Sequence, residues 1–398
     1  MKLIKSCGAC AIPLPDLGAK QCSNCKTRYC GPACQVQHWR EGGHDKLCKK
    51  IKKAGGAEQY YADKKCAEAV AVAVEECADD TQGQTCYICL EDGSEEGLVR
   101  GCACRGAAGL AHVSCLTKQA KIATDEADPD DDDVWDASWD KWTTCGVCKQ
   151  EHHGVVMNAL GWACWKTYVG RPEADETRRT ALTTLSFGIS SDTEASICIH
   201  EAHLDCVRRF APEDEYDLLS AKSNLAVAYK TNGRASEALA LEREIYAKSK
   251  EIGEDSVDAI VTVNNLADSL MVTGLFAKAR TLVREHLTEA SDSIGADHQE
   301  TLYLRMNYAV SLTYEDANHN EESDDEQDRK DYLEAERVAA DVLRRAERIF
   351  GSHHPVTDDA RAILKDVRKE IAGHERRTTL RRRPKRVRTS CPPRTNHY

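Results

Sequence analysis

Cysteine and histidine side chains in close pairs dominate the first 148 residues of this 398-residue chain. Sixteen of them fall into two consecutive groups of eight, and one to three other residues separate the members of each pair. A pair of thiolate or imidazole ligands supplies half of a tetrahedral zinc site, and two pairs complete one. Each site must therefore join pairs that are distant in sequence. The spacing predicts four structural zinc ions.

The first group lies between residues 7 and 48. Its members are Cys7, Cys10, Cys22, Cys25, Cys30, Cys34, His44 and Cys48. With Tyr29, Gln35 and Trp39 between the ligands, the segment resembles a MYND finger. The resemblance implies one ion on Cys7, Cys10, Cys30 and Cys34, and another on Cys22, Cys25, His44 and Cys48. The stretch from Trp39 to His44 is longer than in that family, which leaves His38 as an alternative to His44.

The second group lies between residues 86 and 148, and its histidine is the fifth of eight ligands. Its members are Cys86, Cys89, Cys102, Cys104, His112, Cys115, Cys145 and Cys148. This order is similar to that of the RING-CH (variant RING) domain. The resemblance implies one ion on Cys86, Cys89, His112 and Cys115, and the other on Cys102, Cys104, Cys145 and Cys148. The 29-residue gap before Cys145 is longer than usual in that family, and its acidic run, residues 130–133, is expected to be a solvated loop.

Buried thiols and disulfides are the alternative for the 20 cysteines, but the spacing is that of metal sites, and no apolar signal segment follows Met1. Residues 1–56 contain few large apolar side chains. Hydrophobic burial alone hardly offsets chain entropy there, whereas each structural zinc contributes on the order of 10–16 kcal/mol. No apolar run approaches the length of a membrane span. We therefore expect an intracellular protein, cytoplasmic or nuclear, without a membrane anchor.

Two helices are expected to position the zinc modules. Between the modules, small and apolar residues recur at helical spacing along one face. They are Ala67, Val70, Val74 and Cys77. A single connecting helix over residues 57–80 would hold the two modules in a fixed relation. The apolar segment 155–165 is too short to cross a bilayer and is expected to begin a buried helix, with His152 and His153 at the surface before it.

The remainder of the chain is repetitive. Asn224-Leu225-Ala226 returns as Asn265-Leu266-Ala267 and as Asn307-Tyr308-Ala309, a period of about 42 residues that is typical of paired helices in a solenoid. Glycines follow at matching offsets, and second helices are expected near Ala238, Ala279 and Ala335. The pattern resembles the kinesin-light-chain type of tetratricopeptide repeat. Residues 176–210 are expected to form a degenerate first unit and residues 354–370 a closing helix. The repeated asparagines are expected to be structural.

The predicted fold is multi-domain: two small zinc-stabilised cross-brace modules followed by an all-α helical-repeat solenoid. The predicted segments are a MYND-type finger (1–56), a linking helix (57–80), a RING-CH-type finger (81–152), tetratricopeptide-like repeats (153–375) and a disordered basic tail (376–398). The tail has nine arginines and lysines and no acidic residue, in a chain of net charge −12. It is typical of a nuclear-import signal or of an RNA- or acid-binding arm. Nucleic acid is not expected as a partner.

The resemblance to RING-CH domains implies a ubiquitin ligase that forms no covalent intermediate and has no catalytic side chain of its own. It would dock a charged conjugating enzyme through Ile88, Leu116, Trp142 and Lys149, and the repeats or the MYND finger would hold the substrate. Core packing is the alternative role for Ile88, Leu116 and Trp142. A non-enzymatic adaptor that binds proteins or peptides is the alternative function. Cys198, His200, His203 and Cys206 do not share one helical face, so helix packing is expected there rather than a metal site.

Overall fold

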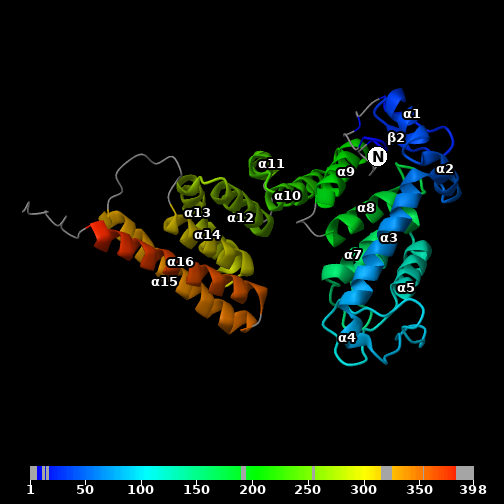
Figure 1. Cartoon of the computed structure of the whole chain (residues 1–398). Helices are drawn as coiled ribbons and strands as arrows, with labels where there is room; N and C mark the ends of the chain where they lie inside the picture. The colour runs from blue at the N-terminus through cyan, green and yellow to red at the C-terminus, as the bar shows by residue number, and fades with distance from the viewer. Residues whose placement is uncertain are drawn as a thin grey trace, which may run out of the picture. The chain divides into compact units, whose positions relative to one another are not determined.

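The computed structural model describes residues 7–10, 14, 18–189, 194–252, 256–314, 325–352 and 354–381. Gly253, residues 315–324 before the third predicted second helix, and most of the basic tail lie outside these ranges. The chain divides into two compact units, residues 1–233 and residues 234–398. Helices make up most of both units (Figure 1).

The first zinc segment is small and has little apolar interior. Strand β1 (Lys20–Gln21) pairs antiparallel with β2 (Arg28–Tyr29), and the helices α1 (Pro32–Arg40) and α2 (His44–Lys53) follow. Tyr29 and Ile51 are its only large apolar side chains with almost no exposed surface among the described residues, and they pack among the cysteines. So small a core agrees with a segment whose fold depends on bound metal.

Helix α3 (Ala57–Glu76) connects the two zinc segments as predicted, and the short α4 (Ala78–Thr81) follows it. The buried face differs slightly from the prediction. Val70, Val74 and Cys77 pack on the core, but Ala67 is exposed, and Cys66 and Ala73 are buried instead. The apolar stripe is therefore rotated by about one residue, because α3 meets α7 beside it as well as the zinc module.

The second zinc segment contains two helices, α5 (Val113–Glu126) and α6 (Asp132–Thr143). Isolated β-bridges between Thr85 and Asp92, Val99 and Ala111, and Thr144 and Glu151 close its loops. Part of the acidic run that was expected to be a solvated loop belongs to α6. The carboxylate of Asp131 accepts a hydrogen bond from the backbone N–H of Val134 at 3.2 Å. Carboxylates stabilise the amino end of a helix, so the run starts a helix.

Helices α7 (Gly154–Tyr168) and α8 (Glu176–Gly188) share one apolar core with α3 and the second zinc segment (Figure 1). Helix α7 is buried along most of its length, as predicted. Two glycines allow the helices to approach closely: a Cβ on Gly188 would lie 2.7 Å from the carbonyl oxygen of Met157, and one on Gly161 would lie 3.2 Å from the Cα of Leu185. Residues expected to open the repeat region thus complete the core of the zinc module. Helices α9 (Glu194–Phe210) and α10 (Glu215–Thr231) complete the unit.

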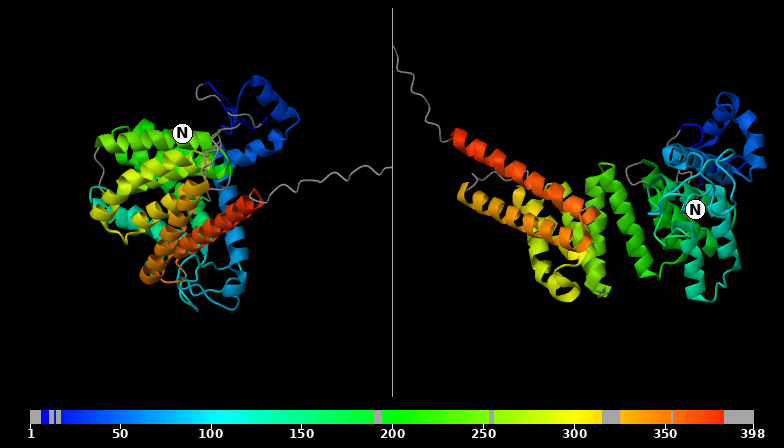
Figure 2. Two further views of the ribbon diagram at one scale, coloured as in Figure 1. Left: turned by 90° about the vertical axis from the view of Figure 1, so that its left-hand side faces the viewer. Right: turned by 90° about the horizontal axis from the view of Figure 1, so that it is seen from below.

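The second unit is a succession of helices. They are α11 (Ala235–Ile252), α12 (Ser256–Val272), α13 (Phe276–Ala290), the π-helical turn η1 (Ser291–Gly295), α14 (Gln299–Thr313), α15 (Asp325–Phe350) and α16 (Pro355–Arg381). Each helix packs on the next, and Figure 2 shows α15 and α16 side by side. Gly274, between α12 and α13, has a φ of 75°, a conformation that glycine adopts without strain. In the part of the chain that the structure describes, no helix is long and apolar enough to span a bilayer.

Of the repeated asparagines, Asn307 bonds to Asn264, the residue that precedes the repeated Asn265. The Asn307 side-chain amide donates to the side-chain oxygen of Asn264 at 3.2 Å, and the amide of Asn264 donates to the backbone carbonyl of Glu300 at 3.0 Å. These bonds join α12 to α14, one repeat further along the chain. Asn264 and Asn307 therefore stabilise the stacking of repeats.

Candidate metal centres

The sixteen predicted ligands gather into four clusters of four. The clusters are Cys7, Cys10, Cys30 and Cys34; Cys22, Cys25, His44 and Cys48; Cys86, Cys89, His112 and Cys115; and Cys102, Cys104, Cys145 and Cys148. Within each cluster the potential ligand atoms all lie within 4.8 Å of one another. In both segments, pairs that are distant in sequence interleave, as the two resemblances implied.

Three Cys-x2-Cys pairs sit in knuckles of the same backbone geometry. In each, the residue after the second cysteine has a positive φ: Lys26 at 64°, Leu90 at 65° and Lys149 at 61°. Its N–H donates to the carbonyl of the first cysteine at 2.9 Å in all three cases. Among the described residues other than glycine, these three alone have positive φ. The conformation costs a residue with a side chain about 1–3 kcal/mol, and such strain is typical of functional sites.

The distances between ligand atoms fit a tetrahedral zinc ion. Two sulfurs bound at about 2.3 Å to one tetrahedral zinc lie about 3.8 Å apart. The Sγ atoms of Cys22 and Cys48 are 3.8 Å apart, and those of Cys104 and Cys145 are 3.9 Å apart. The Sγ of Cys89 lies 3.4 Å from Nδ1 of His112. The clusters are therefore compatible with zinc.

Charge also favours a bound cation. Burial raises the pKa of Cys25 to about 11, and the neighbouring Cys30 and Cys10 thiols raise that of Cys34 to about 12. Four thiols this close cannot all ionise on their own. A divalent cation removes this penalty and stabilises the thiolates. The backbone N–H of Gln150 acts in the same direction on Cys148, and lowers its pKa to about 7.

The two histidines use different ring nitrogens. Nδ1 of His112 faces the third cluster, while its Nε2–H donates to the carbonyl of Asp92 at 2.9 Å, a bond that holds the ring in the ligating tautomer. In the second cluster, Nε2 of His44 lies 3.3 Å from Sγ of Cys25. His38, the alternative ligand, instead pairs its Nδ1 with the hydroxyl of Tyr29 at 3.1 Å. The geometry selects His44.

The four residues predicted to contact a conjugating enzyme differ in accessibility. Lys149 is exposed and Ile88 is half-buried. Leu116 and Trp142 are buried in the shared core, where the indole N–H of Trp142 donates to the hydroxyl of Thr124 at 3.1 Å. Core packing, the alternative interpretation, therefore describes Leu116 and Trp142, because α7 packs against α5 and α6, which carry them.

Two exposed apolar residues of the knuckles were missed. Leu90 is 75% exposed, and Val147 is 48% exposed. Val147 lies between the last two cysteines, just as Ile88 lies between the first two, and this equivalence was a usable sequence signal. The knuckles are neighbours, since a Cβ on Gly146 would lie 3.3 Å from the hydroxyl of Tyr87. We call Ile88, Leu90, Val147 and Lys149 the knuckle surface.

Two other predictions concern histidines and cysteines outside the clusters. Among the described residues, Cys198, His200, His203 and Cys206 do not form a metal-binding group, and His203 instead bonds through Nε2 to the hydroxyl of Thr183 at 2.9 Å. The surface position expected for His152 is wrong: this ring is buried, while His153 is exposed. Helix α7 begins directly after the pair, and the His152 side chain packs in the interior.

Comparisons with known proteins agree with the predicted RING-CH segment and with the predicted repeats. The family model of the RING-variant domain matches residues 86–130, and that of the tetratricopeptide repeat matches residues 218–252 and 323–356. No curated protein matches the sequence. The chain is similar to a crystal structure from Podosopora anserina, named as a kinesin light chain with nearly identical TPR-like repeats, at 15% identity and a TM-score of 0.36. The similarity covers 60% of this chain and 97% of that one.

The two family matches define the class: a protein that joins a RING-variant domain to tetratricopeptide repeats. The predicted fold class, small zinc-binding modules followed by a helical-repeat solenoid, is confirmed. Tetratricopeptide repeats are protein-interaction modules, so the partners of this part of the chain are proteins or peptides.

Proposed function

We propose that the protein is a RING-type ubiquitin ligase that binds four zinc ions. The observation that carries the proposal is the RING-variant match together with the knuckle surface, where exposed apolar side chains stand directly on the metal clusters. An exposed Leu90 in a strained backbone conformation is costly for stability and suits a binding role. Lys149, at the equivalent position of the last knuckle, supplies a positive charge beside it.

Catalysis of this kind is positional. The knuckle surface would hold a conjugating enzyme that carries ubiquitin as a thioester, in an orientation that favours attack by a substrate lysine. No side chain of this protein forms a bond to ubiquitin. The zinc ions keep the knuckles in place and take no part in the transfer.

The other modules would supply the substrate. We infer that residues 7–48 form a MYND-type finger, because the ligand order, Tyr29 and Trp39 match that family and the clusters interleave in its pattern. Trp39 lies beside His44, with ring centroids 5.7 Å apart, and is 49% exposed. A peptide bound there, or on the repeats, would be the region of the substrate that is recognised.

A non-enzymatic adaptor is the second candidate. It is favoured by the burial of Leu116 and Trp142, which removes two of the four expected contacts and leaves a smaller knuckle surface. The same modules would then bring proteins together without ubiquitin transfer.

A ubiquitination assay with purified components distinguishes the ligase from the adaptor. The full-length protein, with zinc content measured, is incubated with the activating enzyme, ubiquitin and a panel of conjugating enzymes. A ligase forms ubiquitin chains, and Ile88→Ala abolishes them while the zinc content is unchanged. Ile122→Ala, on the exposed face of α5, is the matched control and retains activity. Absence of chains with every conjugating enzyme, at four zinc equivalents, supports the adaptor.

A further inference from the structure

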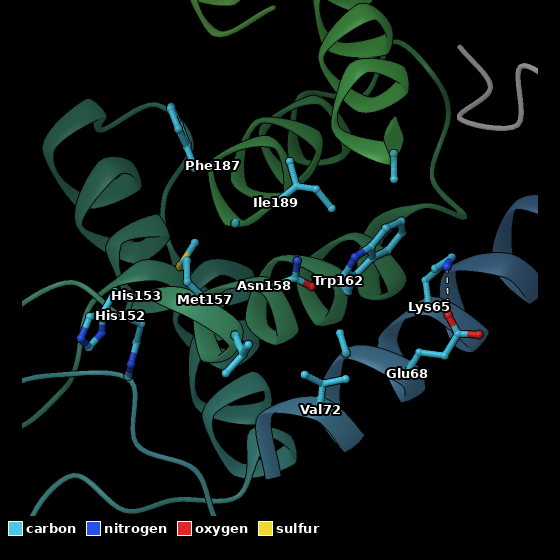
Figure 3. A pocket seen from close by; sticks show the side chains of 15 residues that line it. Lys65, Glu68, Val72, His152, His153, Met157, Asn158, Trp162, Phe187 and Ile189 are labelled. Atoms are coloured by element: carbon cyan, nitrogen blue, oxygen red, sulfur yellow. Dashed lines mark hydrogen bonds and ion pairs between the residues drawn. The ribbon is translucent and has the colours of Figure 1, made fainter. Parts of the chain in front are cut away.

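A cavity of about 730 Å³ lies among α3, α7, the carboxyl end of α8 and the start of α9 (Figure 3). Its α3 wall is formed by Lys65, Glu68, Ala69 and Val72, which share one face of the helix. None of the sixteen predicted metal ligands lines it. The volume is in the range of about 300–1,000 Å³ that is typical of ligand sites.

The mouth of the cavity is apolar and open. Val72 on α3 is 46% exposed, and Phe187 at the end of α8 is 59% exposed. Figure 3 shows these two side chains on opposite sides, with Trp162 and Met157 between α3 and α8. A small molecule within the cavity would leave both outer side chains in water. A peptide that crosses the mouth would cover both, and the covered area would favour its binding.

A carboxamide lies on this surface, which also carries the ionisable side chains of Lys65, Glu68, His152 and His153. The side chain of Asn158 is half-buried in the cavity and has no hydrogen-bond partner among the described residues (Figure 3). A carboxamide offers one acceptor and two donor hydrogens, which complement the C=O and N–H of a peptide backbone. An amide left free in an apolar groove therefore points to a peptide, whose backbone groups otherwise lose their partners on burial.

The charges of the cavity cancel. The ammonium group of Lys65 lies 2.9 Å from the carboxylate of Glu68, so both are paired. Burial, with the nearby His153, lowers the pKa of His152 to about 4, which keeps this ring neutral. The surface therefore offers no free positive charge to an acidic peptide, a phosphate or a nucleic acid. An uncharged apolar segment is the complementary partner.

We propose that this cavity binds an uncharged, apolar peptide segment of a partner protein, with one large apolar side chain between Val72 and Phe187 and a backbone amide paired with Asn158. The site is separate from the knuckle surface and from the repeats, so it does not depend on ligase activity. It gives the helical core around α3 and α7 a recognition role of its own.

The test uses the full-length, zinc-loaded protein and a displayed library of random dodecapeptides. Selection on the wild type is combined with counter-selection on Val72→Glu, and enriched peptides are synthesised and titrated by fluorescence anisotropy. We expect enriched sequences with a large apolar residue and no net charge. Their affinity should fall about tenfold or more with Asn158→Ala, as for loss of a buried hydrogen bond. Phe187→Ser should weaken them similarly.

Ile122→Glu is the matched control, because Ile122 on α5 has the same 46% exposure as Val72 and lies outside the cavity. It should leave peptide affinity unchanged. Zinc content and circular dichroism of each variant exclude misfolding. The proposal is overturned if no peptide prefers the wild type to Val72→Glu, if Asn158→Ala binds as well as the wild type, or if the enriched peptides are acidic.

Discussion

Arg178 on α8 joins three segments of the N-terminal unit, and replacing it should be costly. Its Nη1 donates to the carbonyls of Val169 at 2.6 Å and Arg171 at 2.7 Å, and its Nη2 lies 3.0 Å from Oε2 of Glu58 at the start of α3. The guanidinium also stacks over Trp165, 5.4 Å from the ring centroid. The side chain is 9% exposed and that of Glu58 is 25% exposed. The ion pair is therefore largely removed from water.

The expected loss follows from the groups left behind. In Arg178→Met, two carbonyls lose their donor, at about 1–3 kcal/mol for each one that stays buried. Glu58 loses its partner but keeps some contact with water, which reduces the free-energy cost of leaving its carboxylate unpaired. We expect a total of about 3–5 kcal/mol, the range for a broken buried ion pair. Glu58→Gln should cost only about 1 kcal/mol, since the amide oxygen still accepts from Arg178.

Tryptophan fluorescence can measure this loss in the intact chain. All six tryptophans lie at or before Trp165, so urea unfolding followed by fluorescence reports on the N-terminal unit alone. Arg209→Met is the control, because the Arg209–Glu173 ion pair is exposed and should contribute less than about 1 kcal/mol. A loss below about 1 kcal/mol for Arg178→Met, or equal losses for Arg178→Met and Glu58→Gln, would refute the reasoning.

Three further predictions test the metals, the knuckles and a buried histidine. Chelation of zinc should unfold the N-terminal unit through residue 188, because α7 and α8 share its core. Circular dichroism should still detect the helices of residues 256–381. Simultaneous loss of the N-terminal unit and of these helices would contradict the prediction. Lys149→Gly should preserve or raise the melting temperature relative to Lys149→Ala, because glycine relieves the positive φ, and a lower value for the glycine variant counts against a strained knuckle. Burial lowers the pKa of His203 from 6.5 to about 4, so the folded state favours the neutral ring. Its contribution is fully present above pH 6.5 and is lost as the pH falls towards 4. His203→Gln should make the urea midpoint less dependent on pH over that interval, although His152 and His200 keep part of the dependence. An unchanged dependence would exclude the mechanism.

Ligand spacing was sufficient to predict the metal clusters. A tetrahedral ion needs two pairs, and the order of the pairs in two known patterns predicts which of them meet. Spacing also favoured His44 over His38, because three residues separate His44 from Cys48, and the direction of the two rings agrees with that choice. The repeats could also be predicted, since a period of about 42 residues places Asn265 and Asn307 one unit apart.

Burial near the metals could not be predicted in the same way. Trp142 lies three residues before the ligand Cys145, where contact with a partner and packing in a core are equally compatible with the sequence. The burial of Trp142 depends on α7, which follows the zinc segment and covers it. No local sequence pattern indicates that this helix packs there. Packing against α7 also explains the burial of His152 and the rotated apolar face of α3. Local spacing predicts elements, whereas the partner of each apolar face depends on contacts between distant residues.

The continuous α3 helix also restricts how the sequence can change in length. Each residue of an α-helix turns the chain by about 100° and advances it by 1.5 Å. One inserted residue between Glu58 and Cys77 would swing the first zinc segment a quarter-turn or more around the axis and separate Glu58 from Arg178. Insertions of seven residues, close to two full turns, nearly restore the angular phase but lengthen the helix by about 10 Å. The spacing between the two metal-bearing segments is thus fixed in angle as well as in distance.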